Sequence, residues 1–261
     1  MVLIGITGGD FKAEIRVAKL INTLWRMIRI KAFRAVDDID SCEIFAQGHT
    51  KVLEDHGIKP VASSNSEWFF NPTVYGILIL SSTSDEVYGG ARLHIAGGAQ
   101  PLPIETAIGK LDNKIYDLVK GYADKGTGEF CGLWNDKKAA GKGYNILLGR
   151  ASIARASVVI AGILDILSLF ALCASYTLRP ALNAGFEVET SLGDKGTFSY
   201  PKPDLRAVVA VLRNLTTLSA ATLKEKESIL ELIANPRQQK IEIGPKGPIE
   251  VEYDLTIPRH E

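Results

Sequence analysis

The spacing of apolar residues predicts alternating helices and strands at the start of the chain. Apolar positions in residues 13–26 recur three and four apart, which predicts an amphipathic helix. Residues 27–36 alternate between apolar and polar positions, which predicts a strand with one buried face. Asp37 or Asp38 is then placed to cap a helix that continues to about Asp55.

The middle of the chain predicts a hairpin, a helix and a short strand. Residues 74–81 and 87–96 are apolar segments on either side of a polar turn, which predicts a β-hairpin. After two prolines, residues 104–120 predict one helix, and residues 129–134 predict a short strand. A polar turn that contains glycines occupies residues 135–143.

The last part of the chain continues this alternation. Residues 163–173 are almost continuously apolar, so we expect them to form a buried central strand. The other expected elements are helices at 144–160, 177–184 and about 220–234, a strand at 186–190, and two strands around Pro245. Strands that alternate with helices and hairpins indicate an α/β or α+β fold around a mixed sheet.

Composition and charge exclude several classes of function. The chain has 261 residues, of which 46% are apolar, enough for a substantial core. The 30 basic residues balance the 30 acidic ones, which argues against a dedicated nucleic-acid surface. The apolar stretch 158–174 is interrupted by Gly162 and Asp165, so a helix end followed by a buried strand explains it better than a membrane span. We expect neither nucleic acid nor a membrane as partner.

The cysteines indicate neither a disulfide framework nor a metal site. The chain has three, Cys42, Cys131 and Cys173, widely spaced and without a neighbouring Cys/His cluster. Their apolar surroundings favour a packing role over a nucleophilic one. The N-terminus lacks the basic segment and long apolar stretch of a secretory signal. We therefore expect a reduced, cytoplasmic protein that needs no metal.

The turn at 135–143 has the composition of a phosphate-binding turn. Gly141 and Gly143 allow close approach of the backbone to a ligand, and the helix that follows presents unpaired N–H groups with a partial positive charge. Three lysines add countercharge: Lys137, Lys138 and Lys142. The spacing fits neither a Walker loop nor a Rossmann fingerprint. A helix start without a ligand is the alternative interpretation.

The run from Lys138 to Gly143, Lys-Ala-Ala-Gly-Lys-Gly, resembles the Arg/Gln-x-x-Gly-x-Gly/Ala motif of the GNAT superfamily of acyltransferases, with Lys at the first position. A Leu-Trp-Asn strand end precedes the run, and a long helix, a strand, a short helix and the triplet Gly185-Phe-Glu follow it. Upstream, the sequence Gly-Gly-Ala-Arg-Leu-His, which begins at Gly89, takes the place of the third strand.

The resemblance implies a fold and a division of the chain. It covers residues 27–213, which would form the acyltransferase domain, with an N-terminal extension at 1–26 and a C-terminal helix and strand extension at 214–261. The implied fold is a central mixed sheet with one splayed pair of strands and flanking helices. The implied activity is transfer of an acetyl or longer acyl group to an amine or similar small-molecule acceptor, through a ternary complex.

The same resemblance implies how the donor, acetyl-CoA or another acyl-CoA, would bind. Its pyrophosphate would lie on the main-chain N–H groups of residues 138–144. Its pantetheine arm would follow the strand end at 133–135, where that strand splays from the strand at 163–173. The donor-binding residues implied in this way are Leu133, Trp134, Asn135, Lys138, Ala139, Ala140, Gly141, Lys142, Gly143 and Tyr144.

Candidates for proton transfer each have a plainer interpretation. Glu129 is similar in position to the carboxylate base of the family, although a solvated glutamate at a strand edge is the alternative. The usual position of the tyrosine that protonates the thiolate holds Ala181, a departure from the pattern. Tyr176 is the substitute candidate, and a packed tyrosine is the alternative. His94 is a candidate to reach the acceptor side of the sheet. The alternative interpretation is that His94 is a hydrogen-bonded histidine of the core.

A second resemblance concerns the donor. The insertion that begins Leu102-Pro-Ile-Glu is similar to the acyl-homoserine-lactone and N-acyl-amino-acid synthases, which take long acyl chains from acyl carrier protein. Four apolar residues would then line an acyl pocket, or would pack on the sheet instead: Ile108, Leu111, Ile115 and Leu118. A non-catalytic protein that binds an acyl thioester is a further alternative. The sequence leaves the acceptor unidentified, and a free sheet edge is compatible with a homodimer.

Overall fold

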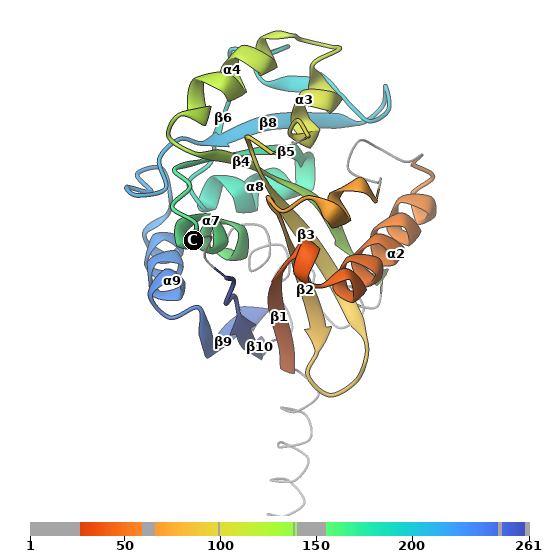
Figure 1. Cartoon of the computed structure of the whole chain (residues 1–261), viewed down its shortest axis with the longest axis vertical. Helices are drawn as coiled ribbons and strands as arrows, with labels where there is room; N and C mark the ends of the chain where they lie inside the picture. The colour runs from red at the N-terminus through yellow and green to blue at the C-terminus, as the bar shows by residue number, and fades with distance from the viewer. Residues whose placement is uncertain are drawn as a thin grey trace, which may run out of the picture.

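The computed structural model describes residues 27–58, 66–98, 100–137, 139, 155–244 and 247–258. In this part of the chain a ten-stranded mixed sheet runs in the order β6-β8-β5-β4-β3-β2-β1-β10-β9, and β7 pairs with β8 beside it. Helices lie on both faces of the sheet. Figure 1 shows α3 and α4 at one end of the molecule and the β9–β10 hairpin at the other.

The strands are β1 (Met27–Arg34), β2 (Val74–Ser81), β3 (Val87–Ile95), β4 (Thr127–Asn135), β5 (Ser168–Ala174), β6 (Glu187–Val188), β7 (Thr197–Ser199), β8 (Arg206–Leu212), β9 (Arg237–Gly244) and β10 (Gly247–Asp254). The α-helices are α2 (Ile39–Asp55), α3 (Pro103–Ile108), α4 (Lys114–Ala123), α7 (Ser157–Ile163), α8 (Ser175–Asn183) and α9 (Leu223–Ala234). Short 3-10 helices lie at η1 (Ala35–Asp37) and η3 (Glu67–Phe70).

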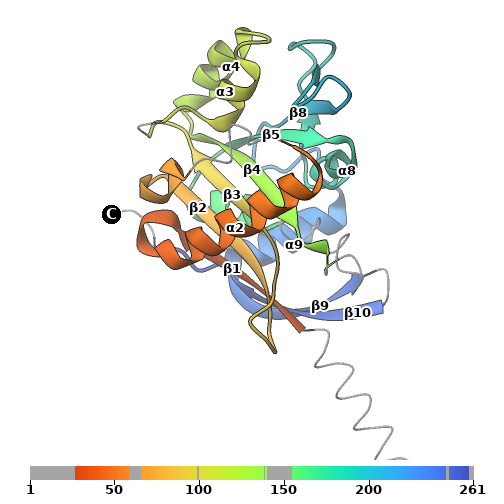
Figure 2. The same ribbon diagram turned by 90° about the vertical axis from the view of Figure 1, so that its right-hand side faces the viewer.

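Helix α2 begins and ends close to where the sequence predicts. The carboxylate of Asp38 caps its N-terminus by accepting a hydrogen bond from the main-chain N–H of Ser41 at 3.0 Å. The buried face of the helix carries Cys42 and Phe45, which pack with Trp68 and Trp134 in one apolar cluster. Figure 2 shows α2 crossing the sheet over β2, β3 and β4.

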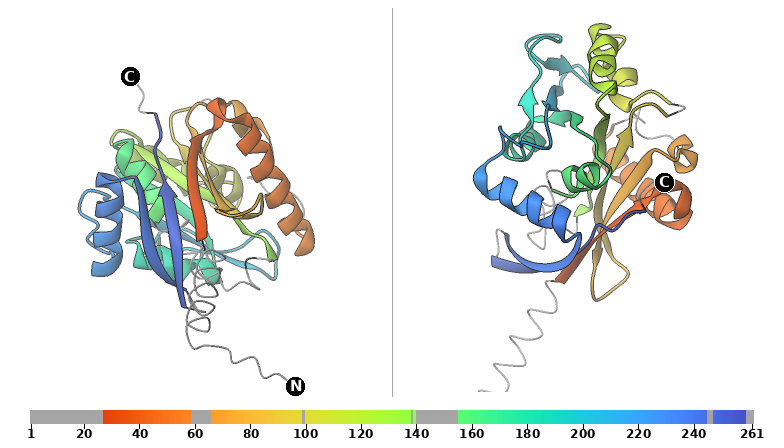
Figure 3. Two further views of the ribbon diagram at one scale, coloured as in Figure 1. Left: turned by 90° about the horizontal axis from the view of Figure 1, so that it is seen from below. Right: turned by 60° about the vertical axis from the view of Figure 1, so that its left-hand side comes forward.

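The two faces of the sheet carry separate cores. Helices α7, α8 and α9 contribute to a large cluster on one face, with residues such as Val159, Ile229 and Ile30. On the other face α3 and α4 contribute Ile108 and Ile115 to a second cluster. Figure 3 shows α2 and α9 on opposite sides of the sheet. Residues that project from alternate positions of each strand therefore belong to different environments.

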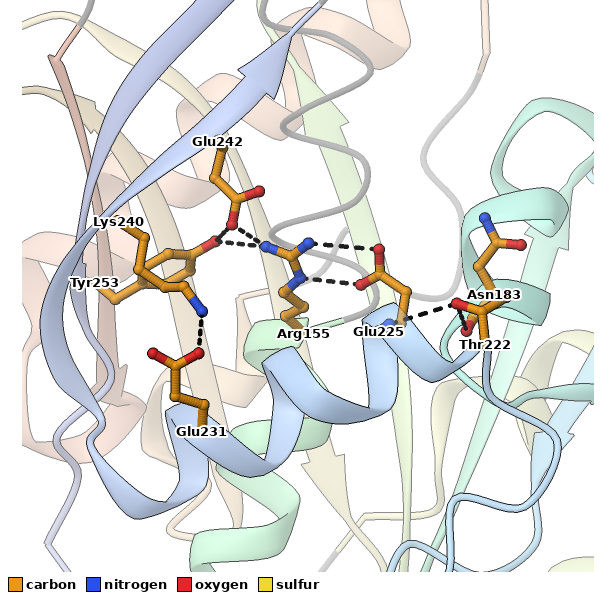
Figure 4. Close-up of polar contacts among 8 residues, drawn as sticks. All are labelled: Arg155, Asn183, Thr222, Glu225, Glu231, Lys240, Glu242 and Tyr253. Atoms are coloured by element: carbon orange, nitrogen blue, oxygen red, sulfur yellow. Dashed lines mark hydrogen bonds and ion pairs between the residues drawn. The ribbon is translucent and has the colours of Figure 1, made fainter.

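The C-terminal strands extend the sheet beyond β1. Strand β10 pairs in parallel with β1, and β9 pairs antiparallel with β10. Behind these strands the guanidinium of Arg155, only 2% exposed, donates to Glu225 of α9, Glu242 of β9 and the hydroxyl of Tyr253 on β10 (Figure 4). One buried cation thus connects the start of α7 to all three C-terminal elements.

Several predicted elements differ in extent. The helix predicted at 104–120 is divided into α3 and α4 by a turn at 109–113. The strand predicted at 163–173 begins only at Ser168, because α7 continues to Ile163 and Asp165 adopts a left-handed turn conformation with φ 57°. The helix predicted at 13–26 lies outside the described residues. Among the described helices, none is both long and apolar enough to cross a membrane.

Candidate active site at the split between two strands

Strands β4 and β5 pair over half of β4 and then separate. Their parallel pairing runs from Thr127 with Ser168 to Phe130 with Ala171. Beyond this point β4 stays paired with β3 as far as Asn135, and β5 stays paired with β8. The main-chain groups of residues 131–135 that face β5 therefore have no strand beside them in the described part of the chain. This confirms the splayed pair of strands that the family resemblance implies (Figure 2).

A bulge in β4 explains the separation. On the β3 side, Cys131 lies opposite Arg92, and Trp134 lies opposite Gly90, so β4 contains one residue more than β3 between these pairs. Gly132 within the bulge has φ +60°, a conformation that glycine adopts without steric penalty. A side chain there would also lie 3.2 Å from Nε of Arg92. Gly132 is thus required both for the bend of β4 at the bulge and for the close approach of Arg92 to the main chain.

A cluster of polar side chains lies on the α2 and α3 face at the base of the split. Strand pairing places His94 opposite Glu129 and Arg92 opposite Cys131 on this face. Arg92 is fully buried, and its guanidinium lies 4.4 Å from the centre of the Trp68 ring and 5.2 Å from that of Phe45. Burial lowers the pKa of Arg92, which nevertheless remains the cation of this cluster.

Glu129 is buried rather than solvated. It is 2% exposed, and its Oε2 accepts a hydrogen bond of 2.5 Å from the main-chain N–H of Ile104 in α3. Burial raises the pKa of Glu129 to about 8, although the bond from Ile104 and the charge of Arg92 both act in the opposite direction. The interpretation of Glu129 as a solvated strand-edge glutamate is therefore wrong. A buried carboxyl with a raised pKa is typical of a general base.

His94 and Cys131 complete the cluster. His94 is 6% exposed, and its Nε2 has no hydrogen-bond partner among the described residues. Burial, with a further contribution from Arg92, lowers the pKa of His94 well below its usual range, so the imidazole is neutral. Burial raises the pKa of the Cys131 thiol to about 12, although Arg92 acts against the shift. This thiol is not poised as a nucleophile.

The three predicted donor-binding residues at the end of β4 differ in environment. Leu133 packs against the core on the α7 side, and Leu133 and Asn135 are partly exposed. The Trp134 ring is buried on the α2 side, where it meets Phe45 edge to face with ring centres 6.0 Å apart. The Trp134 side chain is therefore a packing group, and the main chain of this stretch lies at the open edge.

Little of the predicted phosphate turn is described. Ala139 has a buried side chain, and its main-chain N–H donates to the carbonyl of Asp136 at 2.9 Å, so this amide is already engaged. Lys137 forms an ion pair with Asp55 at the end of α2 (3.1 Å). The other predicted turn residues lie outside the described residues: Lys138, Ala140, Gly141, Lys142, Gly143 and Tyr144.

Tyr176 lies at the open end of the split. It belongs to α8, which begins directly after β5, and its side chain is 83% exposed, so the interpretation as a packed tyrosine is wrong. Because β4 and β5 are parallel, their carboxyl ends lie at the same edge of the sheet. Ala181, which holds the position usual for the family's tyrosine, is fully buried in the core.

Helices α3 and α4, which the second resemblance assigns to an insertion, contribute buried residues to the core. Ile108 and Ile115 are fully buried and belong to one cluster with Phe170 and Val209 of the sheet. Leu111, by contrast, is 57% exposed. The described residues also contain no group of three or more His, Cys, Asp or Glu side chains placed to hold a metal ion.

Two residues that shape this site are not among those predicted from the sequence. The sequence prediction includes Arg92 only within a strand motif, although a charged residue inside a largely apolar strand is a signal of a buried cation. The sequence predicts a regular strand at 129–134, which includes Gly132. A glycine within a strand is a signal of a bulge, and the structure shows one there.

Comparisons with known proteins support the fold. No protein-family model matches the chain, and no curated protein matches it in sequence. Among solved structures, the chain is similar to FeeM, an N-acyl amino acid synthase from uncultured soil microbes, with TM-score 0.52, 14% identity and coverage of 77% of this chain and 97% of FeeM.

Two CoA-dependent acyl-homoserine lactone synthases also match. For MesI the TM-score is 0.46 at 12% identity, with 79% of this chain and 95% of MesI covered. For BjaI, in complex with SAM and isopentyl-CoA, the TM-score is 0.46 at 15% identity, with 84% of this chain and 94% of BjaI covered. The likeness to FeeM shows that the chain has the fold of the GNAT acyltransferases.

Proposed function

We propose that this protein is an N-acyltransferase that moves an acetyl or longer acyl group from acyl-CoA to an amine acceptor within a ternary complex. The observation that carries the proposal is the separation of β4 and β5 directly beside a buried carboxyl, that of Glu129. The GNAT fold and the predicted glycine turn support it. The proposed acceptor is a small molecule.

The open edge of β4 suits the donor. Main-chain N–H and C=O groups at 131–135 offer hydrogen bonds to an extended chain, as a sheet edge does to an added strand. The pantetheine arm of CoA is extended and contains amide groups. The turn after β4 would bind the pyrophosphate through N–H groups other than that of Ala139, which is engaged.

The chemistry then needs one base and one acid. The amine nitrogen of the acceptor attacks the thioester carbonyl, its proton passes to Glu129, a C–N bond forms, and the C–S bond breaks. The departing thiolate of CoA takes a proton, for which we propose Tyr176 at the open end of β5. Direct transfer is favoured over an acyl-cysteine intermediate, because the nearby Cys131 remains a thiol.

A second candidate function concerns the donor. An N-acyl amino acid or homoserine lactone type of synthase is favoured by the helices α3 and α4, which the second resemblance treats as an insertion, and by the fold shared with an N-acyl amino acid synthase. Acyl carrier protein is the donor that the second resemblance implies for such a synthase. A non-catalytic protein that binds acyl thioesters is the remaining alternative. The buried carboxyl Glu129 at the split supports catalysis over binding alone.

Location and assembly are further proposals. Three free cysteines fit a reducing, cytoplasmic location. Strand β9 forms an edge of the sheet, and it exposes Ile241 (72%) and Ile243 (65%), which supports a homodimer. Light scattering of the purified protein would measure the mass and would contradict the dimer if only monomer were present.

The test of the proposed function is release of free thiol from acetyl-CoA, long-chain acyl-CoA and acyl carrier protein, each with a panel of amines. We expect turnover with at least one pair, and a rate that falls about 10²–10⁴-fold in Glu129→Gln. Preference for acyl carrier protein would favour the second candidate. If the protein binds a donor but transfers the acyl group to none of the acceptors, the proposal that it is an enzyme is contradicted.

A further inference from the structure

His94 carries an unexplained buried nitrogen. Its side chain is 6% exposed, and its Nε2 makes no hydrogen bond to any described residue. Nearly all buried polar atoms in folded proteins are hydrogen-bonded, so an exception calls for a water molecule, a ligand or a catalytic role. His94 lies directly opposite Glu129 on the same face of the sheet, and this position indicates a role beside the proposed catalytic base.

Burial, with a contribution from the Arg92 cation, keeps the imidazole of His94 neutral. Arg92 lies on the same strand and face, Glu129 lies opposite His94 on β4, and the charge of Glu105 in α3 raises the pKa of Glu129. From β2, the opposite residue is the apolar Val74. Burial and the Arg92 cation both disfavour the imidazolium form. In a neutral imidazole one nitrogen carries the proton and the other is only an acceptor.

We propose that Nε2 of His94 and the carboxylate of Glu129 together hold the water molecule through which the acceptor loses its proton. This inference rests on the proposed function. The water donates one hydrogen bond to Nε2 and the other to Glu129, which directs its lone pairs toward the acceptor amine. Three hydrogen bonds, including the one from the amine, are typical of a buried water.

The proton balance assigns distinct roles to the two residues. As the amine attacks, its proton passes to the water, and the water gives a proton to Glu129. His94 neither gains nor loses a proton, because Glu129 holds a proton far more strongly in this environment. His94 is therefore a positioning residue that orients the water, and it acts in the tautomer with the proton on Nδ1.

Two substitutions distinguish the roles of the two ring nitrogens of His94. Gln places a polar atom near the position of Nε2, whereas Asn places one near Nδ1. We expect His94→Asn to lower kcat about 10–100-fold, with KM for the donor unchanged, and His94→Gln to retain most of the activity. The rise of kcat with pH belongs to Glu129, so it should persist in both variants. His49→Gln is the matched control, because His49 is a buried, neutral histidine on α2.

The outcomes distinguish the inference from the proposed function. If wild-type protein transfers acyl groups but His94→Asn retains its kcat, or if His94→Asn and His49→Gln lose activity equally, the inference is overturned. A wild type without turnover for any donor and amine would overturn the proposed function instead. Nitrogen-15 NMR of histidine-labelled wild-type protein tests the tautomer without any variant. We expect Nε2 of His94 to be unprotonated at neutral pH, and a protonated Nε2 would contradict the inference.

Discussion

Arg155 and Glu225 form a buried ion pair between the start of α7 and the helix α9. Nε of Arg155 lies 2.9 Å from Oε2 of Glu225, and both side chains are less than a tenth exposed. Glu242 and the hydroxyl of Tyr253 bind the same guanidinium (Figure 4). Removing one partner of such a network leaves uncompensated charge in a medium that solvates it poorly.

We therefore predict that Arg155→Met lowers the free energy of unfolding by about 3–5 kcal/mol, measured by urea denaturation. The matched control is Lys240→Met, which removes the ion pair between Lys240 and the half-exposed Glu231. An exposed pair of this kind contributes about 0–1 kcal/mol. Equal losses in the two variants would contradict a structural role for the buried network.

Gly132 provides a second prediction. Gly132→Ala would place a methyl group 3.2 Å from Nε of Arg92 in a backbone conformation with φ +60°. We expect a loss of about 1–2 kcal/mol in stability, together with weaker binding of CoA as the bulge distorts. Gly121→Ala is the control, because a methyl group there meets nothing within 4 Å on an exposed turn of α4. It should be neutral or stabilising by about 0.5–1 kcal/mol. Calorimetry of CoA binding and of unfolding measures both effects.

The pKa of Glu129 predicts how activity depends on pH. A general base must be ionised, so the rate of transfer should rise with pH and level off above about 8, where Glu129 loses its proton. Glu129→Gln should abolish the rise along with most of the activity. A wild-type profile that is flat between pH 6 and 9, with chemistry rate-limiting, would exclude Glu129 as the base.

The same group predicts how stability depends on pH. The pKa of Glu129 is about 8 in the folded protein and near the ordinary value of 4.5 in the unfolded chain. Between these values the folded state binds the extra proton, so this contribution to stability is complete below about pH 4.5 and is lost as the pH rises to about 8. Because Gln does not titrate, the free energy of unfolding of Glu129→Gln should increase relative to that of the wild type as the pH rises from about 4.5 to about 8. Parallel stability curves for the two proteins would contradict the raised pKa.

The local elements were predictable because their signals lie within a few residues. The hairpin of β2 and β3 follows from two apolar segments around a polar turn, and the start of α2 follows from Asp38 as a cap. The family resemblance also placed the split between β4 and β5 correctly. Each of these predictions rests either on residues close together in the sequence or on the order of strands and helices in the family.

Contacts between distant parts of the chain were not predictable in this way. No periodicity indicates that β10 pairs in parallel with β1, more than 200 residues earlier, or that Arg155 meets Glu225. Glu129 is buried next to α3, where the main-chain N–H of Ile104 binds its carboxyl group. The local sequence around Glu129 therefore allows a solvated carboxylate, whereas residues distant in the sequence bury it in the folded protein.

In the proposed mechanism, an acyl-CoA enters between β4 and β5. A crystal structure of the protein with a non-hydrolysable acyl-CoA thioether tests it most directly. We expect the pantetheine arm to hydrogen-bond to the main chain of residues 131–135, with its acyl end near Glu129. A donor bound elsewhere, or strands joined along their whole length with no room between them, would contradict the claim.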